Sequence, residues 1–174
     1  MRPMALDDLG LAPAINQLVG RLASRGILST DFSVDGKAYD LPKHVEIAIF
    51  RVVQEALNNV AHHAGTDKAR VRLLYRPQAV SVLIEDEGKG FDAEADPEIP
   101  DVPAEEILAD GTDHVGQFGI MGMKERAKII GAEFNVLSTI GKGTRIHLRV
   151  PNKLPGANKE DVKVVNTPDK GKKS

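Results

Sequence analysis

The spacing of apolar residues along this chain switches between a helical and a strand period, and the order of those switches constrains the fold most. Apolar residues recur every three or four positions over residues 11–25 and 42–63, which predicts two amphipathic helices. Residues 69–76 and 79–86 alternate instead, with Pro77-Gln78 between them, which is typical of a β-hairpin. The first half of the chain therefore predicts two helices packed on a hairpin.

The second half repeats this pattern. Apolar positions from Ile120 to Ile130 predict a further helix that Gly131 ends, and residues 133–139 and 144–150 predict a closing hairpin. A short extended segment, residues 28–34, precedes the second helix. About three helices can cover only one face of such a sheet, so we expect an α+β fold, a two-layer α/β sandwich with a mixed sheet.

Length and composition limit the classes of function. The 174 residues, 41% of them hydrophobic, suffice for one domain with a core. A net charge of −2 offers no basic surface for nucleic acid, so we expect no such partner. The absence of cysteine excludes disulfides and thiolate metal sites. Without a long apolar run or a secretory signal, we expect no membrane contact from this segment and a cytoplasmic location, although a parent protein could be membrane-anchored.

Charge and proline mark the boundaries of the domain. Residues 92–113 contain nine acidic residues and no Lys or Arg, which predicts a mobile loop. From residue 152 onward, six lysines and little apolar periodicity predict a solvated, disordered tail, unless the valines at 162–165 add an edge strand. The folded domain should therefore span residues 11–151.

Asp86 continues the inward, apolar row of Ile84 in its predicted strand. A carboxylate that faces a core is costly unless it meets hydrogen-bond donors, and the exocyclic amine of adenine is one. The alternative is that Asp86 only starts a turn with Gly88. Thr144 continues the inward row of the last strand and would reach the same pocket if the two strands are neighbours. The alternative is an ordinary threonine at the start of a strand.

Two glycine clusters could hold a nucleotide. Gly88 and Gly90 would let a base or ribose approach the backbone closely, although isolated glycines more often form turns. Gly116, Gly119 and Gly122 lie just before and within the start of a predicted helix, where free amides and the helix dipole favour an anion such as a triphosphate. A flexible loop-to-helix junction is the alternative.

Glu55 and Asn59 lie one turn apart on the helix of residues 42–63, so both can point into one cavity. An Asn amide oxygen suits Mg²⁺ that bridges phosphates, and a Glu can take a proton from a nucleophile. Asn58 is a rival ligand, and an ordinary solvated polar face is the alternative.

Together these segments resemble the catalytic ATP-binding domain of bacterial sensor histidine kinases, which belong to the gyrase, Hsp90, histidine kinase and MutL (GHKL) ATPases with the Bergerat ATP-binding fold. The resemblance covers roughly residues 11–151. Four segments carry it, in the order of the family's N, G1, G2 and last glycine boxes: Phe50–Ala64, Glu85–Phe91, Phe118–Arg126 and Gly141–Thr144. The Gln-Glu-Ala-Leu-x-Asn and Gly-Ile-x-Gly-Met-x-Glu-Arg variants are similar to the subclass of nitrate, degradative-enzyme and lipid-fluidity sensors.

The resemblance implies that the domain binds ATP and Mg²⁺ and acts as a protein histidine kinase of a two-component system. Glu55 would be the catalytic base and Asn59 the Mg²⁺ ligand. The ATP-binding residues that it implies are Asn59, Asp86, Gly88, Gly90, Gly116, Gly119, Ile120, Gly122, Met123 and Thr144. The γ-phosphate would pass to a histidine on the parent's own dimerisation domain and then to a response regulator, with the parent acting as a homodimer.

Two features depart from the family pattern. None of the five histidines has the sequence context of a phosphoacceptor, so we expect the acceptor to lie outside this chain, and residues 1–10 look like the end of the dimerisation helix and its linker. The predicted ATP lid, about residues 92–117, is longer and more acidic than expected, which predicts disorder without nucleotide. Rival interpretations are an ATP hydrolase of the gyrase or MutL type, a serine kinase of the anti-sigma type, and a regulatory module that has lost nucleotide binding.

Overall fold

The structure is a computed structural model that describes residues 4–93 and 114–152. Its elements, in chain order, are α1 (Met4–Leu9), α2 (Leu11–Ser24), β1 (Ser29–Asp35), α3 (Lys43–His63), β2 (Lys68–Arg76), β3 (Ala79–Asp86), α5 (His114–Ile129), β4 (Glu133–Thr139) and β5 (Gly143–Pro151).

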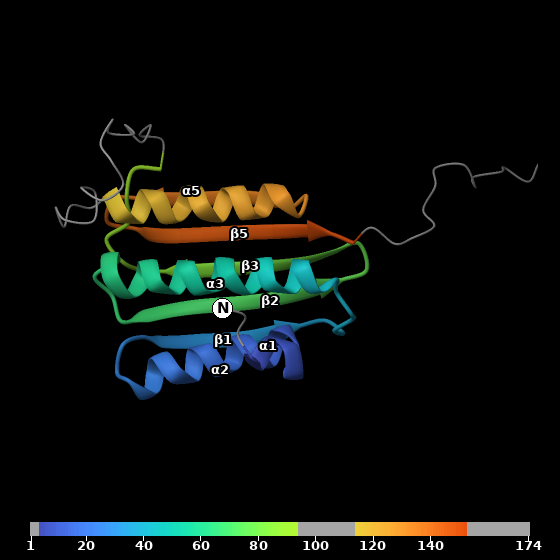
Figure 1. The fold of residues 1–174 in the computed structure, drawn as a ribbon. Helices are drawn as coiled ribbons and strands as arrows, with labels where there is room; N and C mark the ends of the chain where they lie inside the picture. Colours follow the sequence, from blue (N-terminus) through green and yellow to red (C-terminus); the bar gives the residue numbers. More distant parts are fainter. Residues whose placement is uncertain (1–3, 94–113, 153–174) are drawn as a thin grey trace, which may run out of the picture.

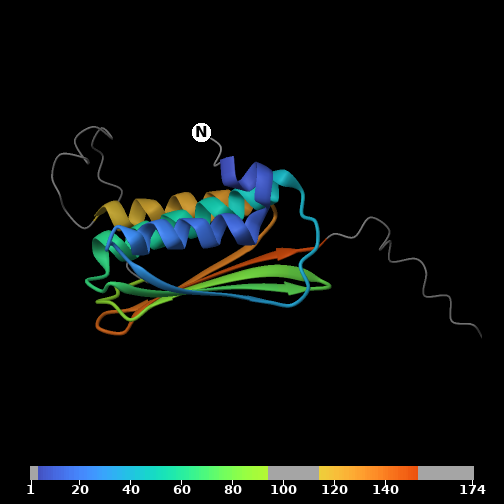
Figure 2. The ribbon, with the colours of Figure 1, turned by 90° about the horizontal axis from the view of Figure 1, so that it is seen from below.

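The described residues form two layers. Their five strands make one sheet in the order β1-β2-β3-β5-β4, in which β1 runs parallel to β2 and the other neighbours are antiparallel. Figure 1 shows α2, α3 and α5 in front of the sheet, and the turned view in Figure 2 shows that all three cover the same face. The predicted α+β sandwich with a mixed sheet is confirmed.

The core lies between the helices and the sheet. Val82 and Ile84 of β3 are buried, and so are Ile146 and Leu148 of β5, which confirms the predicted inward rows. The long helix α3 supplies the largest share of the helical side, through Val45, Ile49, Phe50, Val52, Val53, Ala56, Leu57 and Val60. Because α3 lies over the middle of the sheet, its polar residues are fixed relative to the strand ends (Figure 1).

The uncovered face of the sheet carries ion pairs between neighbouring strands. Arg70 pairs with Asp31 at 3.6 Å, Arg76 with Asp35 at 2.7 Å, Arg145 with Glu85 at 2.6 Å and Arg149 with Glu133 at 3.2 Å. In each pair at least one side chain is more than half exposed, so each pair stabilises the fold by at most about 1 kcal/mol. This face of the sheet is therefore exposed to solvent, which agrees with a helical layer on the other face only.

The segment predicted as a linker, residues 1–10, packs on the domain where it is described. It forms the short helix α1, whose Leu6 is 1% exposed and belongs to the core. Lys43 at the start of α3 donates a 2.6 Å hydrogen bond to the carbonyl oxygen of Leu6. Gly10, at a φ of +85°, then separates α1 from α2.

Two boundaries differ from the sequence prediction. Pro42 was expected as the first residue of α3, but its ψ of 139° is extended, so it lies just before the helix. Helix α5 begins at His114, earlier than the predicted start near Gly116, so Gly119 and Gly122 lie inside the helix.

The tail from residue 153, and most of the predicted acidic lid (94–113), lie outside the described residues. Among the helices that are described, none has the length and apolar character needed to cross a membrane.

Candidate functional site

A cavity of about 150 Å³ lies between the C-terminal half of α3, the ends of β3 and β5, the loop after β3 and α5. A cavity of roughly this size in another protein accepts a benzene-sized ring. Its apolar lining comes from Ala56, Val60, Ala64, Ile84, Phe91, Ile120 and Ile146, and its remaining lining residues are Asn59, His63, Asp86, Lys89, Gly90 and Thr144. An apolar pocket with a few polar groups at one side is the usual form of a small-molecule site.

Asp86 is the only carboxylate among the residues that line this cavity. Burial raises the pKa of Asp86 above its ordinary value, although the backbone N–H groups of Gly88 and Thr144 act in the opposite direction. The N–H of Gly88 donates to Oδ1 of Asp86 at 2.8 Å. Asp86 therefore does open the turn at Gly88, as the alternative interpretation held, but it also faces the cavity, where its lone pairs are available to a donor on a ligand.

Thr144 lies directly opposite Asp86, because β3 and β5 are neighbours and these two residues are partners in their register. Both side chains line the cavity. Thr144 was predicted to reach the pocket of Asp86 only if their two strands are neighbours, and they are.

The loop after β3 is held through Lys89, whose backbone bonds to two other segments. The N–H of Lys89 donates to the carbonyl oxygen of Ala64, at the end of α3, at 2.7 Å, and the N–H of Gly141 donates to the carbonyl oxygen of Lys89 at 2.6 Å. A Cβ on Gly88 would lie 2.6 Å from the Cβ of Ala64. Gly90 has a φ of +60°, and a Cβ there would collide with the backbone of Thr139. Both glycines are therefore required by packing, and Gly90 also lines the cavity.

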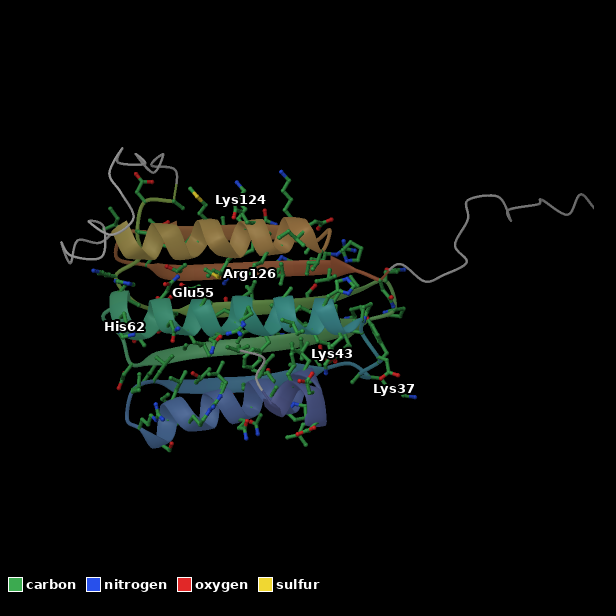
Figure 3. All side chains as sticks on the ribbon, in the orientation of Figure 1. Lys37, Lys43, Glu55, His62, Lys124 and Arg126 are labelled. Atoms are coloured by element: carbon green, nitrogen blue, oxygen red, sulfur yellow. The ribbon has the colours of Figure 1, made fainter. Side chains whose placement is uncertain are left out.

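Glu55 and Asn59 lie on the side of α3 that faces α5, where Figure 3 labels Glu55. A Cβ on Gly119 would lie 2.7 Å from Oε1 of Glu55 and 3.1 Å from the amide atoms of Asn59. Of the two candidate asparagines, Asn59 lines the cavity, whereas Asn58 is exposed. Glu55 is not among the residues that line it, so it lies next to the cavity, one turn along α3.

Comparison with known families matches residues 44–154 to the model described as histidine kinase-, DNA gyrase B-, and HSP90-like ATPase. The match covers α3, β2, β3, α5, β4 and β5, and so every element around the cavity. The chain belongs to this ATPase family. Membership implies that the domain binds ATP.

Relatives within this ATPase family are sensor kinases. The signal transduction histidine-protein kinase/phosphatase DegS of Brevibacillus brevis is 35% identical over 151 residues, which cover 87% of this chain and 35% of that protein. The sensor protein VraS of Staphylococcus saprophyticus is 31% identical over 162 residues, which cover 92% of this chain and 40% of that protein. The chain thus corresponds to the ATP-binding domain of two-component sensor kinases, and it spans well under half the length of these curated relatives.

A solved structure supports the fold assignment. The histidine kinase domain of the blue-light activated histidine kinase EL346 from Erythrobacter litoralis superimposes with a TM-score of 0.55 at 22% sequence identity, over 81% of this chain and 64% of that one. At this identity the likeness concerns the fold alone.

Several residues that the ATPase resemblance named lie away from the cavity. Met123 is 0% exposed and belongs to the hydrophobic core, and it does not line the cavity, whereas its helix neighbour Ile120 does. Gly122 is also absent from the lining, and the nearest atom to a Cβ there would be Nη1 of Arg126 at 3.4 Å. Since α5 begins at His114, the N–H groups of Gly119 and Gly122 fall beyond the first four, free N–H groups of the helix.

Among the lining residues with polar or aromatic side chains, sequence reasoning missed His63, Lys89 and Phe91, and it also missed Ser138 close by. The first three lie inside the N and G1 segments, so those motifs could have named them. Ser138 belongs to no such motif. Its only sequence signal is that it would oppose Thr144 if the last hairpin closes around residues 140–142, as it does.

Within the described residues no group of three or more His, Cys, Asp or Glu side chains could hold a metal ion. Mg²⁺ in nucleotide sites needs no such group, because it is commonly held by one or two protein ligands together with substrate phosphates. A single half-buried amide such as that of Asn59 fits this type of site.

Proposed function

We propose that this chain is the catalytic ATP-binding domain of a sensor histidine kinase, which donates the γ-phosphate of ATP to a histidine on a dimerisation domain outside this chain. The observation that carries the proposal is the placement of Asp86 and Thr144 together at one end of an apolar cavity, in a chain of the ATPase family. The names of its relatives favour a histidine acceptor over water. A hydrolase of the gyrase or MutL type would use the same residues with Glu55 directed at water.

In this proposal the adenine ring enters the cavity and its exocyclic amine donates to the carboxylate of Asp86. Thr144, Gly90 and Ile120 line the same space and contact the base or the sugar. Gly88 lets the loop lie close to the end of α3. The backbone N–H of Lys89 can therefore donate to the carbonyl oxygen of Ala64. Met123, buried on α5, supports the site by anchoring that helix in the core.

The phosphates would leave the cavity along the side of α3 that carries Asn59 and Glu55. Asn59 would hold Mg²⁺, whose charge neutralises the phosphates. Gly116 lies in the first turn of α5, where free N–H groups favour an anion, and Gly119 and Gly122 could add their own N–H groups only if that end of α5 unwinds. During transfer the bond from the γ-phosphorus to the β,γ-bridging oxygen breaks, a phosphorus–nitrogen bond forms, and Glu55 accepts the imidazole proton.

The wider assignments follow from the same proposal. The parent protein would be a homodimer that phosphorylates its own dimerisation domain, and the phosphate would pass to a response regulator. Residues 1–10 would connect the two domains, and residues 11–151 would form the ATP-binding domain. This domain would lie in the cytoplasm, whether or not the parent is membrane-anchored.

Two experiments test the proposal in order. Calorimetric titration of Mg-ATP into this chain should show one saturable site, and Asp86→Ala should weaken it by about 10-fold or more, because a hydrogen bond to a charged group is lost. Equal binding by both proteins would contradict the role of Asp86. The second experiment is a chimera in which this chain replaces the matched segment of the Brevibacillus brevis kinase. It should become labelled from γ-labelled ATP in an acid-labile, base-stable form, whereas ATP turnover without any labelled protein would favour the hydrolase.

A further inference from the structure

The hydroxyl of Ser138, on β4, makes three polar contacts beside the cavity. The backbone N–H of Phe91 donates to it at 2.9 Å, the carbonyl oxygen of Gly143 lies 3.1 Å from it, and Oγ1 of Thr144 lies 2.9 Å from it. Ser138 and Thr144 are direct partners in the register of β4 and β5, and Thr144 is in turn the partner of Asp86 on β3. The three side chains therefore form one row across three strands.

The three contacts determine where the hydroxyl protons lie. A backbone N–H can only donate, a carbonyl oxygen can only accept, and a serine hydroxyl has a single proton. All three contacts carry a proton only if the proton of Ser138 goes to the carbonyl oxygen of Gly143. The contact with Thr144 then has a proton only if the Thr144 hydroxyl donates it to Ser138. One arrangement alone gives all three contacts a proton.

This arrangement leaves Thr144 with lone pairs but no proton to offer a ligand in the cavity that it lines. The neighbouring Asp86, as a carboxylate, also only accepts. At the end of the cavity where Asp86 and Thr144 meet, both side chains therefore act as acceptors. A purine with a 6-amino group places two N–H donors next to Asp86 and Thr144. A purine with a 6-oxo group places an acceptor there instead, so that buried acceptors face one another without a proton between them.

We propose that Ser138 is a specificity-determining positioning residue, which fixes the hydroxyl of Thr144 as an acceptor and so makes the site select 6-amino over 6-oxo purine nucleotides. The inference rests on the proposed function, since it assumes that the cavity holds the base of ATP. Ser138 also ties the Phe91 end of the loop to the sheet, but that role would affect both kinds of nucleotide equally.

The test compares Mg-ATP with Mg-ITP, which differ only at the 6-position and the adjacent ring nitrogen, by calorimetry on four forms of this chain. The unaltered chain should prefer ATP. Ser138→Ala frees the Thr144 proton to turn toward the cavity, so the ratio of ATP affinity to ITP affinity should fall by about fivefold, the equivalent of one ordinary hydrogen bond. Ser138→Thr, which keeps a hydroxyl, should retain the ratio. The matched control is Ser81→Ala, on the sheet face away from the cavity, which should change neither affinity.

The readouts separate this inference from the proposed function. If Ser138→Ala weakens ATP and ITP by the same factor, Ser138 only holds the loop, and the inference is overturned while the ATP site stands. If the unaltered chain binds neither nucleotide, the proposed function fails and the inference fails with it. Should Ser138→Ala not fold, Ser138→Cys keeps the size of the side chain with a much weaker donor and acceptor, and it should lower the ratio in the same direction. In a Thr144→Val background, substitution of Ser138 should no longer change the ratio, and a further change there would also overturn the inference.

Discussion

Asp86 and Thr144 face each other across β3 and β5, and both line one cavity. This pairing places a half-buried carboxylate at the end of an otherwise apolar row of β3, where nothing in the fold itself requires a charge. A charge in such a place lowers the stability of the fold, and a ligand that donates hydrogen bonds to it recovers that loss. Stability and binding should therefore respond in opposite directions when Asp86 is changed.

The first prediction concerns Asp86→Asn. Asn keeps an oxygen that can accept the N–H of Gly88 and removes the partly desolvated charge, so the variant should unfold at a higher temperature than the unaltered chain at pH 7. Its affinity for ATP should fall, because an amide oxygen is a weaker acceptor than a carboxylate. Thermal unfolding and calorimetry measure the two effects. A lower melting temperature for Asp86→Asn at pH 7 would show that burial of this charge does not destabilise the fold.

The same residue predicts a pH dependence with a definite sign. Burial raises the pKa of Asp86 in the folded chain above its ordinary value of 3.8, so over the interval just above 3.8 the folded state binds more protons than the unfolded state. The contribution of Asp86 to stability therefore falls as pH rises through that interval and stays low above it. The stability advantage of Asp86→Asn should be full at neutral pH and should shrink as pH falls toward 3.8, which thermal unfolding across this range measures.

Gly119→Ala should separate folding from nucleotide binding. The new Cβ would lie 2.7 Å from Oε1 of Glu55, the end of a flexible side chain that can turn away, so the fold should persist. The helix should even gain up to about 1 kcal/mol in propensity. The displaced Asn59 should lose its proposed hold on Mg²⁺, and the Mg²⁺-dependent part of ATP affinity should fall by about 10-fold. Titrations with Mg²⁺ and with a chelator measure this part.

Gly20→Ala on α2 is the matched control for Gly119→Ala. Gly20 is exposed, and a Cβ there meets no atom within 4 Å. This variant should gain similar helix stability and keep the full ATP affinity. If both variants bind Mg-ATP as the unaltered chain does, the contact between Gly119 and the two polar residues of α3 has no role in binding.

Leu6→Ala tests whether the N-terminal segment is part of the folded domain. Leu6 is 1% exposed, so its truncation should lower the free energy of unfolding by about 2 kcal/mol or more. Leu9, in the same helix, is 58% exposed, and Leu9→Ala should change it by no more than about 0.5 kcal/mol. Urea unfolding of both variants gives the comparison. Equal, small effects would mean that α1 is a linker without a structural role in the domain.

Periodicity alone predicted much of this fold. The alternation of residues 79–86 matches β3 residue for residue, because alternation reports directly which side chains face a core. The start of α5 could not be predicted in this way. Glycines at 116, 119 and 122 oppose helix formation locally, and the packing of α5 on α3, which brings Gly119 beside Glu55 and Asn59, involves segments far apart in the sequence.

In the candidate site, too, residues with a local sequence pattern could be predicted and residues that depend on distant contacts could not. Asp86 and Thr144 could be predicted because each continues an inward row of its own strand, and only their adjacency needed the sheet order. Ser138 could not, because its contact with Phe91 joins residues 47 positions apart, and only its register with Thr144 follows from the last hairpin. Residues whose function depends on a contact between distant segments carry no local signal.

Gly88→Ala should damage fold and site together, in contrast to Gly119→Ala. A Cβ at Gly88 would lie 2.6 Å from the Cβ and 2.9 Å from the carbonyl carbon of Ala64, and these atoms belong to the end of α3 and cannot turn away. To relieve this clash, the loop must move away from α3. That movement weakens the hydrogen bond from the N–H of Lys89 to the carbonyl oxygen of Ala64, and it shifts the N–H of Gly88 that donates to Asp86. The free energy of unfolding should fall by about 1–3 kcal/mol.

ATP affinity should fall with it, even under conditions where Gly88→Ala is fully folded, because the N–H of Gly88 that holds the carboxylate of Asp86 moves with the loop. Urea unfolding and calorimetry on the same preparation measure both quantities, with Gly20→Ala again as the control. Loss of stability with unchanged ATP affinity would mean that the position of the loop does not matter to the base. Unchanged stability would mean that α3 and the loop after β3 are not packed as closely as the contact with Ala64 requires.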